Sequence, residues 1–215
     1  MGSRSRAALM ALAASLLAGR AAAEPDGAAA GGAGDPDSRL SVWAEGIGGG
    51  FRKDTLRAGL SLGGGYGVLA FGGRDRHHLL LSTADLGWIF SDRLRAIPGN
   101  LEADLELFGA EQVDPDFRQV FGGAAQLRYD FALGSRLVPF LLFGLGLSET
   151  DIYGRDLSTL FEFAVEVGAG AHWFLSERTA FTGEWRWFHL SNASIELPNH
   201  GTNTQVLLLG VSFFF

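Results

Sequence analysis

The feature that most constrains the fold is an alternation of apolar and polar side chains with a period of two. Residues 160–174 place apolar side chains on one face and Glu162, Glu166 and His172 on the other. Segments 100–112 and 119–132 repeat this pattern, with polar faces made of Glu102, Asp104, Glu106, Gln126, Arg128 and Asp130. A period of two is that of a β-strand, whose successive side chains point to opposite faces. The pattern therefore predicts a sheet with one apolar face and one charged face.

Strand-length segments of this kind recur along most of the chain, with turn signals between them. The candidates are 40–51, 56–71, 78–90, 100–112, 119–132, 137–148, 160–174, 179–191 and 204–215. These are nine, whereas single-chain bacterial barrels have even numbers of strands. Eight strands suit the length, with one candidate of the glycine-rich region 40–71 absorbed or outside the sheet. Ten strands remain an alternative.

The first 23 residues resemble a secretory signal peptide. Arg4 and Arg6 precede an apolar run from Ala7 to Ala18, and small residues follow before Glu24. We expect a flexible lead-in over 24–39 and one domain over 40–215. After the signal no apolar run reaches 18 residues, yet the mean hydropathy is +0.15 and the chain has 31 glycines. Together these predict an all-β fold, an antiparallel up-and-down transmembrane β-barrel of a bacterial outer membrane. The alternative is a secreted soluble β-sandwich.

In such a barrel the charged side chains should point inward, because Arg or Lys on the lipid face costs roughly 2–4 kcal/mol at mid-membrane. An eight-stranded barrel is too narrow for an open pore. We therefore expect a packed interior of ion pairs. Its acids would be Glu102, Asp104, Glu106, Asp130, Glu162, Glu166 and Glu184, with Arg128 and Arg186 as partners and His172 among them.

Composition excludes several functions. The chain has no cysteine, which excludes disulfides, thiolate nucleophiles and cysteine-bound metals. Removing the three arginines of the signal takes 17 basic residues to 14 against 24 acidic, so the net charge goes from −7 to −10. Such a surface does not suit nucleic acid. The pattern calls for no cofactor and no metal. Gly63-Gly64-Gly65 lacks the Lys-Ser/Thr of a phosphate loop.

The candidate site lies in the last predicted hairpin. If Glu184 and Arg186 face inward, strand parity turns His189 and Ser191 outward, and Asn203 in the final strand shares that face. With both termini in the periplasm, residues 192–202 form an extracellular loop. A histidine can act as the base that activates a serine. Asn192 and Asn199 have side-chain amides that could stabilise an oxyanion. An outward imidazole and hydroxyl thus predict hydrolytic chemistry at the outer leaflet.

This segment closely resembles the PagL-type family of outer-membrane lipid A 3-O-deacylases. The resemblance rests on His189, Ser191-Asn192-Ala193, Ile195, Pro198-Asn199, Gly201 and a terminal strand that ends on Phe215. It implies that His189 is the base, Ser191 the nucleophile, Asn199 an oxyanion donor and Asn192 a supporting residue. It also implies lipid A of lipopolysaccharide as substrate, in contact with outer-membrane lipid. The 3-position comes from the resemblance alone.

The chain departs from the family at one position. Family members place a Glu fourteen residues after the histidine, where this chain has Asn203. Asn can still orient the imidazole, and Glu196 is the second candidate for that role. Two other functions remain open, a non-catalytic structural or adhesion barrel and a lipid A acyltransferase. The sequence also leaves open a homodimer and a calcium ion bridging anionic headgroups. We interpret His77 and His78 as a solvated turn or a phosphate contact, and His200 as a loop residue.

Overall fold

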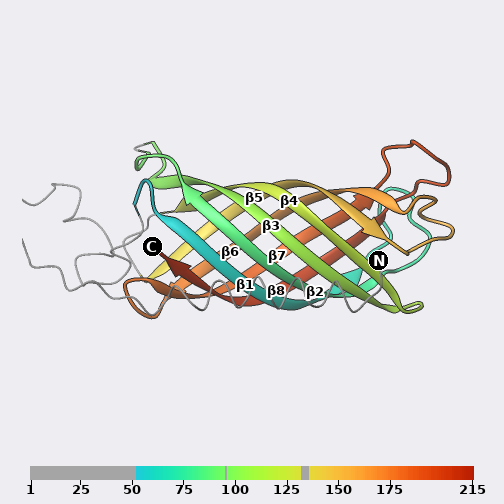
Figure 1. Cartoon of the computed structure of the whole chain (residues 1–215), viewed down its shortest axis with the longest axis horizontal. Helices are drawn as coiled ribbons and strands as arrows, with labels where there is room; N and C mark the ends of the chain where they lie inside the picture. Colours follow the sequence, from blue (N-terminus) through green and yellow to red (C-terminus); the bar gives the residue numbers. More distant parts are fainter. Residues whose placement is uncertain (1–51, 95, 132–135) are drawn as a thin grey trace, which may run out of the picture. The chain divides into compact units, whose positions relative to one another are not determined.

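The computed structural model describes residues 52–94, 96–131 and 136–215, which form one closed antiparallel β-barrel of eight strands (Figure 1). The strands are β1 (Leu56–Gly67), β2 (His78–Ile89), β3 (Gly99–Asp114), β4 (Arg118–Phe131), β5 (Leu137–Thr150), β6 (Phe161–Phe174), β7 (Thr179–Ser191) and β8 (Thr202–Phe214). The prediction of eight strands is confirmed. The candidate strand 40–51, the signal segment 1–23 and the lead-in 24–39 lie outside the described residues. Within the described ranges no helix is long and apolar enough to cross a membrane.

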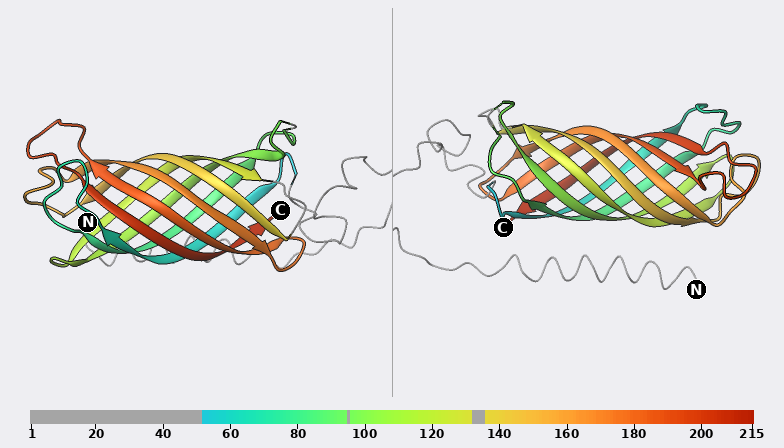
Figure 2. Two further views of the ribbon diagram at one scale, coloured as in Figure 1. Left: turned by 180° about the vertical axis from the view of Figure 1, so that it is seen from behind. Right: turned by 90° about the horizontal axis from the view of Figure 1, so that it is seen from above.

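Each strand pairs with its neighbour in sequence, and β8 closes the barrel against β1. The loops 68–77, 115–117, 151–160 and 192–201 all emerge at one end, which we call the loop end (Figure 2). The C-terminus lies at the other end, the terminal end. The predicted strand 56–71 is shorter than expected, because residues 68–71 leave the sheet and enter the first loop.

The middle of the barrel is filled by charged side chains, as the alternation predicted. Arg186 contacts Glu106 at 2.6 and 2.8 Å, Glu184 at 2.6 Å and Glu166 at 3.2 Å. A second cluster surrounds Arg57, which binds three buried acids, Asp85, Glu102 and Asp104. Sequence reasoning missed Arg57 and Asp85. His172 is buried in the interior as expected, beside Arg128 and Thr182.

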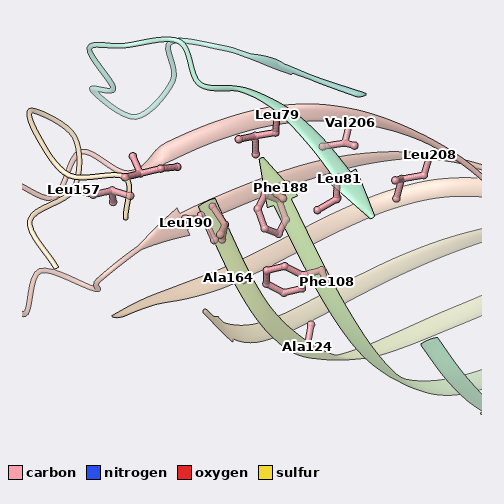
Figure 3. Close-up of a cluster of buried hydrophobic side chains, with 13 residues drawn as sticks. Leu79, Leu81, Phe108, Ala124, Leu157, Ala164, Phe188, Leu190, Val206 and Leu208 are labelled. Atoms are coloured by element: carbon pink, nitrogen blue, oxygen red, sulfur yellow. The ribbon is translucent and has the colours of Figure 1, made fainter. Parts of the chain in front are cut away.

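Apolar layers lie above and below these ions, which the sequence reasoning did not anticipate. The layer toward the loop end contains Phe108, Phe188, Leu190 and Leu157, with Leu157 reaching in from the loop 151–160 (Figure 3). The rings of Phe108 and Phe188 pack edge to face, with centroids 5.3 Å apart. A smaller layer toward the terminal end contains Ile89, Val138, Phe174, Ala180 and Phe214. The barrel interior is therefore packed with side chains, and the ion pairs lie between the two apolar layers, which we call the apolar plugs.

The outer wall is apolar. Large exposed hydrophobic side chains occur on every strand, and along β7 the exposed positions alternate with buried Glu184, Arg186 and Phe188. This alternation fixes the direction of the last residues of β7. Because Phe188 and Leu190 are fully buried in the interior, His189 and Ser191 point outward.

Candidate active site

The candidate site lies on the outer wall at the loop end, where β7 pairs with β8. His189 is directly opposite Asn203 in the register. The two side chains are hydrogen-bonded, with 2.9 Å between His189 Nδ1 and Asn203 Oδ1. The structure therefore brings together two of the predicted residues. Asn203 lies on the same outward face of β8 as Gln205 and Leu207. It is nevertheless only 2% exposed, because the first loop covers it.

The second hydrogen bond of Asn203 fixes the tautomer of His189. Asn203 Nδ2 donates to the backbone carbonyl of Ala70 at 3.1 Å. A carbonyl can only accept, so the amide nitrogen must face Ala70 and the amide oxygen must face His189. That oxygen accepts a hydrogen bond from Nδ1–H, which leaves the lone pair on Nε2. In its neutral form the imidazole is thus held as the Nδ1–H tautomer, and within the described residues Nε2 has no hydrogen-bond partner.

The first loop encloses the other side of the imidazole. The ring of Phe71 packs edge-on against the rings of His189 and Trp187, with centroid distances of 6.1 and 6.3 Å. Phe71 has a φ of 50° and is 80% exposed, so its ring stands out from the loop. At the end of the last loop, just before β8, a Cβ at Gly201 would lie 2.6 Å from His189 Cε1. Gly201 also has a φ of 72°, so glycine suits this position on both counts.

Ser191 is two residues from His189 on the same outward face, opposite Phe163 of β6. Side chains two residues apart on a strand are spaced by about 6.6–6.8 Å along one face. In the described part of the chain, the Ser191 hydroxyl forms no hydrogen bond with His189 or any other residue. The hydroxyl is therefore available to a ligand on the outer wall.

Asn192 and Asn199 are hydrogen-bonded within the last loop. The Asn199 side-chain oxygen accepts the backbone N–H of Asn192 at 3.0 Å, which leaves the Asn199 amide nitrogen to donate elsewhere. Asn192 is fully buried, and its own amide nitrogen already donates to Ser158 Oγ and to the Glu196 carbonyl. Asn192 therefore stabilises the loop, whereas the amide nitrogen of Asn199 remains available to donate a hydrogen bond to a ligand.

A tight turn follows Asn192. The Ile195 N–H donates to the Asn192 carbonyl at 3.1 Å, and the two residues between them, Ala193 and Ser194, have φ values of 54° and 65°. Such values are uncommon outside glycine and persist only where surrounding contacts hold them. Within residues 136–215 the N–H groups of Ala193 and Ser194 donate no hydrogen bond. They are further candidate donors beside Ser191. Glu196, the second candidate for orienting His189, is an exposed loop residue.

Sequence reasoning missed Asp156, the residue that joins three loops at this end. Its buried carboxylate accepts the N–H groups of Arg74 and Asp75, each at 2.8 Å, and lies 3.1 Å from His77 Nε2. Its backbone carbonyl accepts the N–H groups of His200 and Gly201. The interpretation of His77 as solvated is wrong, since this side chain is buried against Asp156 and Gln112. Asp156 lies in the irregular loop 151–160, which carries no periodic signal that would reveal these contacts.

Comparison with known protein families gives one match over residues 82–212, to the family described as lipid A 3-O-deacylase (PagL). The chain belongs to this family. The match includes β7, the last loop and most of β8, so it contains His189, Ser191 and Asn203. Comparison with curated protein sequences finds no match.

Solved structures agree on the fold of this PagL-family chain. The crystal structure of the outer membrane enzyme PagL matches with 18% identity and a TM-score of 0.53, covering 72% of this chain and 97% of its own. Neisserial surface protein A (NspA) matches with 14% identity and the same TM-score, covering 75% and 96%. The PagL-family chain is thus an eight-stranded barrel of the bacterial outer membrane. Because an enzyme and a surface protein fit equally well, the fold does not decide the activity.

Proposed function

We propose that this barrel hydrolyses an ester-linked acyl chain of lipid A, at the 3-position that the family description names. The observation that carries the proposal is the oriented His189 on the outer wall, two residues from Ser191. Hydrolysis needs a base whose free nitrogen is directed away from its orienting partner. Asn203 attaches the first loop through the Ala70 carbonyl, but the half-buried imidazole of His189 on a wall that faces lipid has no comparable structural use.

The reaction proceeds through an acyl-enzyme. Nε2 of His189 takes the proton of the Ser191 hydroxyl as Oγ attacks the ester carbonyl carbon. The Asn199 amide and the N–H groups of Ala193 and Ser194 are the donors for the resulting oxyanion. The tetrahedral intermediate then collapses, and His189 gives its proton to the departing sugar oxygen. A water molecule, deprotonated by His189, attacks the acyl-enzyme and releases the fatty acid with Ser191 restored.

Asn203 stabilises the imidazolium less than a carboxylate would, because it is uncharged. Its contact with Nδ1 nevertheless holds the ring and the tautomer through the whole cycle. The His189–Ser191 hydrogen bond forms when substrate is bound, since catalytic hydrogen bonds are often long in free enzymes. The last loop and the site lie on the extracellular side in this scheme, where the outer leaflet holds lipopolysaccharide.

The test is product analysis by mass spectrometry after incubating the purified barrel with lipopolysaccharide in detergent. Loss of one hydroxyacyl group is expected, whereas gain of an acyl chain would indicate an acyltransferase. Ser191→Ala and His189→Ala should each lower the rate by at least about 10³-fold, as removing members of such a catalytic unit does. Ser176→Ala, in the β6–β7 turn at the terminal end, is the matched control and should keep full activity.

Heat-modifiable migration in electrophoresis shows whether each variant still forms the barrel. A folded Ser191→Ala barrel with undiminished activity would contradict the proposed nucleophile. Lipid A left unchanged by the parent protein would favour a structural barrel instead.

A further inference from the structure

His77 is a buried, titratable side chain that the proposed mechanism does not use. It ends the first loop, and both of its ring nitrogens have polar partners. Nδ1 lies 2.6 Å from Gln112 Oε1, and Nε2 lies 3.1 Å from Asp156 Oδ2. A neutral imidazole donates through one nitrogen and accepts through the other, whereas an imidazolium donates through both. The protonation of His77 therefore follows from what its two partners can do.

Gln112 can only accept a hydrogen bond from His77. The amide nitrogen of Gln112 donates to the backbone carbonyl and to the carboxylate of Asp116, each at 2.9 Å. Both of these oxygens are acceptors, so the amide nitrogen must face Asp116 and the amide oxygen must face His77. His77 Nδ1 therefore carries a proton, which it donates to Gln112.

The second partner, Asp156, also accepts. One oxygen of its carboxylate accepts the backbone N–H of Arg74, and the other accepts that of Asp75 and faces His77 Nε2. A lone pair on Nε2 would point at this carboxylate and repel it, so Nε2 carries a proton as well. Only the imidazolium can donate through both nitrogens. His77 and Asp156 therefore form a buried, charge-assisted pair.

We propose that His77 is a positioning residue for His189, and that the positive charge of His77 holds the loops around the candidate site. His77 itself touches no reacting atom in this proposal. Loss of its proton loosens the loops and lowers activity on the alkaline side. Only the effect on activity rests on the proposed esterase function.

One path from His77 to the site runs through Asp156. Their contact ties the first loop to the loop 151–160. The backbone carbonyl of Asp156 accepts the N–H of Gly201 at 3.2 Å, which holds the end of the last loop. Gly201 lies against the imidazole of His189, since a Cβ added there would be 2.6 Å from Cε1. A shift of Asp156 would therefore move the backbone that packs against the candidate base.

A second path runs along the first loop, which is attached to β8 at both ends. Asn203 donates to the Ala70 carbonyl near the start, and the hydroxyl of Thr204 donates to the His77 carbonyl at 3.1 Å. Between these ends, two N–H groups of the loop bind the Asp156 carboxylate. An imidazolium attracts that carboxylate, whereas a lone pair on Nε2 would repel it. The charge on His77 therefore controls how firmly the first loop is held beside the site.

The charged neighbours of His77 already have other partners. Three pairs lie around it, Asp116 with Arg118, Asp75 with Arg155 and His78 with Asp114. The side chain of Arg76 binds the hydroxyl of Tyr66. β1 and β8 contribute Gly67 and Thr204 beside His77, and neither carries a charge. Among the described residues, the salt bridge of His77 is with Asp156.

The direction of the pH effect follows from the proton count. A histidine in contact with water loses its proton between about pH 5 and 8. Above that range the open loops hold a neutral His77, whereas the closed loops require the imidazolium. The closed arrangement then binds one more proton, so its stability falls as the pH rises. The candidate base must be neutral to act, so activity should follow a bell-shaped profile whose alkaline limb comes from His77.

Nuclear magnetic resonance can measure the protonation of His77 directly. Nitrogen spectra of the parent barrel, labelled on histidine and held in detergent, distinguish an imidazolium from the neutral tautomers. The signals that disappear in His77→Gln belong to His77. We expect both of its nitrogens to be protonated at about pH 7.5, where a histidine in water is mostly neutral. A single protonated nitrogen at that pH would overturn the proposal.

Limited trypsin digestion at Arg74 and Arg76 reports the loop without relying on activity. Dividing the cleavage rate of His77→Gln by that of the parent at the same pH removes the pH dependence of the protease. The ratio should be at least about tenfold at about pH 6, because a hydrogen bond to a charged group is lost. It should approach one at about pH 9, where the parent has lost the same proton. A ratio that does not change with pH means that His77 is no switch.

The pH profile of ester hydrolysis tests the link to the candidate base. We measure kcat/KM for p-nitrophenyl butyrate, corrected for spontaneous hydrolysis. The parent should lose activity on the alkaline side, whereas His77→Gln should have a low value without that limb. His78→Gln replaces the neighbouring histidine, leaves the contact with Asp156 intact and is the matched control, which should keep the alkaline limb. The same limb in His77→Gln would show that His77 does not position His189.

The outcomes for this proposal and for the esterase function are distinct. An active barrel whose His77 is singly protonated overturns the positioning role while the esterase function stands. A parent barrel that hydrolyses neither the ester nor lipopolysaccharide overturns the esterase function. In that case the spectra and the digestion ratio would still show that a charged His77 holds the loops.

Discussion

Replacing Asn203 by Asp separates the two contacts that this side chain makes. Asn203 accepts a hydrogen bond from His189 through Oδ1 at 2.9 Å and donates one to the Ala70 carbonyl through Nδ2 at 3.1 Å. Asp has the same shape, so Asn203→Asp keeps the first contact and makes it ionic. The second contact is lost, because a carboxylate oxygen then faces a carbonyl oxygen. Catalysis and loop attachment should therefore change in opposite directions.

The magnitudes follow from the two hydrogen bonds. A hydrogen bond to a charged group contributes about 1.5–3 kcal/mol against about 1 for a neutral pair. If the difference of roughly 1–2 kcal/mol acts on the imidazolium formed in the transition state, kcat rises about 5- to 30-fold. The broken contact leaves the Ala70 carbonyl unpaired, which costs about 1–3 kcal/mol. That cost falls on the loop 68–77, since the contact lies outside the barrel sheet.

Two assays read these effects separately. Ester hydrolysis gives kcat, and limited trypsin digestion at Arg74 and Arg76 reports opening of the first loop. Asn203→Asp should raise kcat and also speed cleavage of the loop. Asn203→Leu, which loses both contacts, should speed cleavage to a similar degree while kcat falls. If Asn203→Asp is no more active than Asn203→Leu, the contact between Asn203 and the imidazole does not support catalysis, and the role given to Asn203 is refuted.

Two further substitutions test the supports of the site and of the barrel. Asp156→Ala removes the side chain that holds the first loop through three hydrogen bonds, so trypsin should cleave faster at Arg74 and Arg76. The value of kcat/KM should fall about tenfold, which corresponds to roughly 1.4 kcal/mol. Asp75→Ala is the control, because it removes only the exposed pair with Arg155. Arg57→Met leaves three buried acids without their shared cation and should lower the free energy of unfolding in urea by about 3–5 kcal/mol. Arg118→Met, which breaks a surface pair with Asp116, should change it by less than about 1 kcal/mol. Equal effects of Arg57→Met and Arg118→Met would contradict the importance of the interior cluster.

Most of the barrel could be predicted because strand periodicity is a local property. Glu102, Asp104 and Glu106 alternate with apolar residues, and that alone directs them inward. The same alternation predicted that His189 points outward and that Asn203 lies on the same outward face of the neighbouring strand. It failed for Arg57, because glycines and small residues in β1 obscure the alternation around it. Apolar plugs were also missed, since an inward Phe188 and an outward Trp187 look alike in the sequence.

The loop contacts could not be predicted for a different reason. Asp156 and Arg74 are separated by 82 residues, and they meet only because the closed barrel returns the three long loops 68–77, 151–160 and 192–201 to one end. Which side chains then touch depends on irregular backbone, such as the left-handed residues Phe71 and Ala193. No periodic pattern encodes such positions. The outward placement of His189 and Ser191 was therefore predictable, whereas the residues that enclose them were not.

The interior plug and the outer site depend on each other through one register. Phe188 and Leu190 are fully buried in the apolar layer, and His189 and Ser191 occupy the alternate positions. A shift of one residue in β7 would exchange these sets, placing an imidazole and a hydroxyl in the plug and two large apolar side chains on the wall. Burying those polar groups without partners would cost several kcal/mol. The packing at Phe188, which faces away from any substrate, is therefore what directs the candidate base toward the lipid.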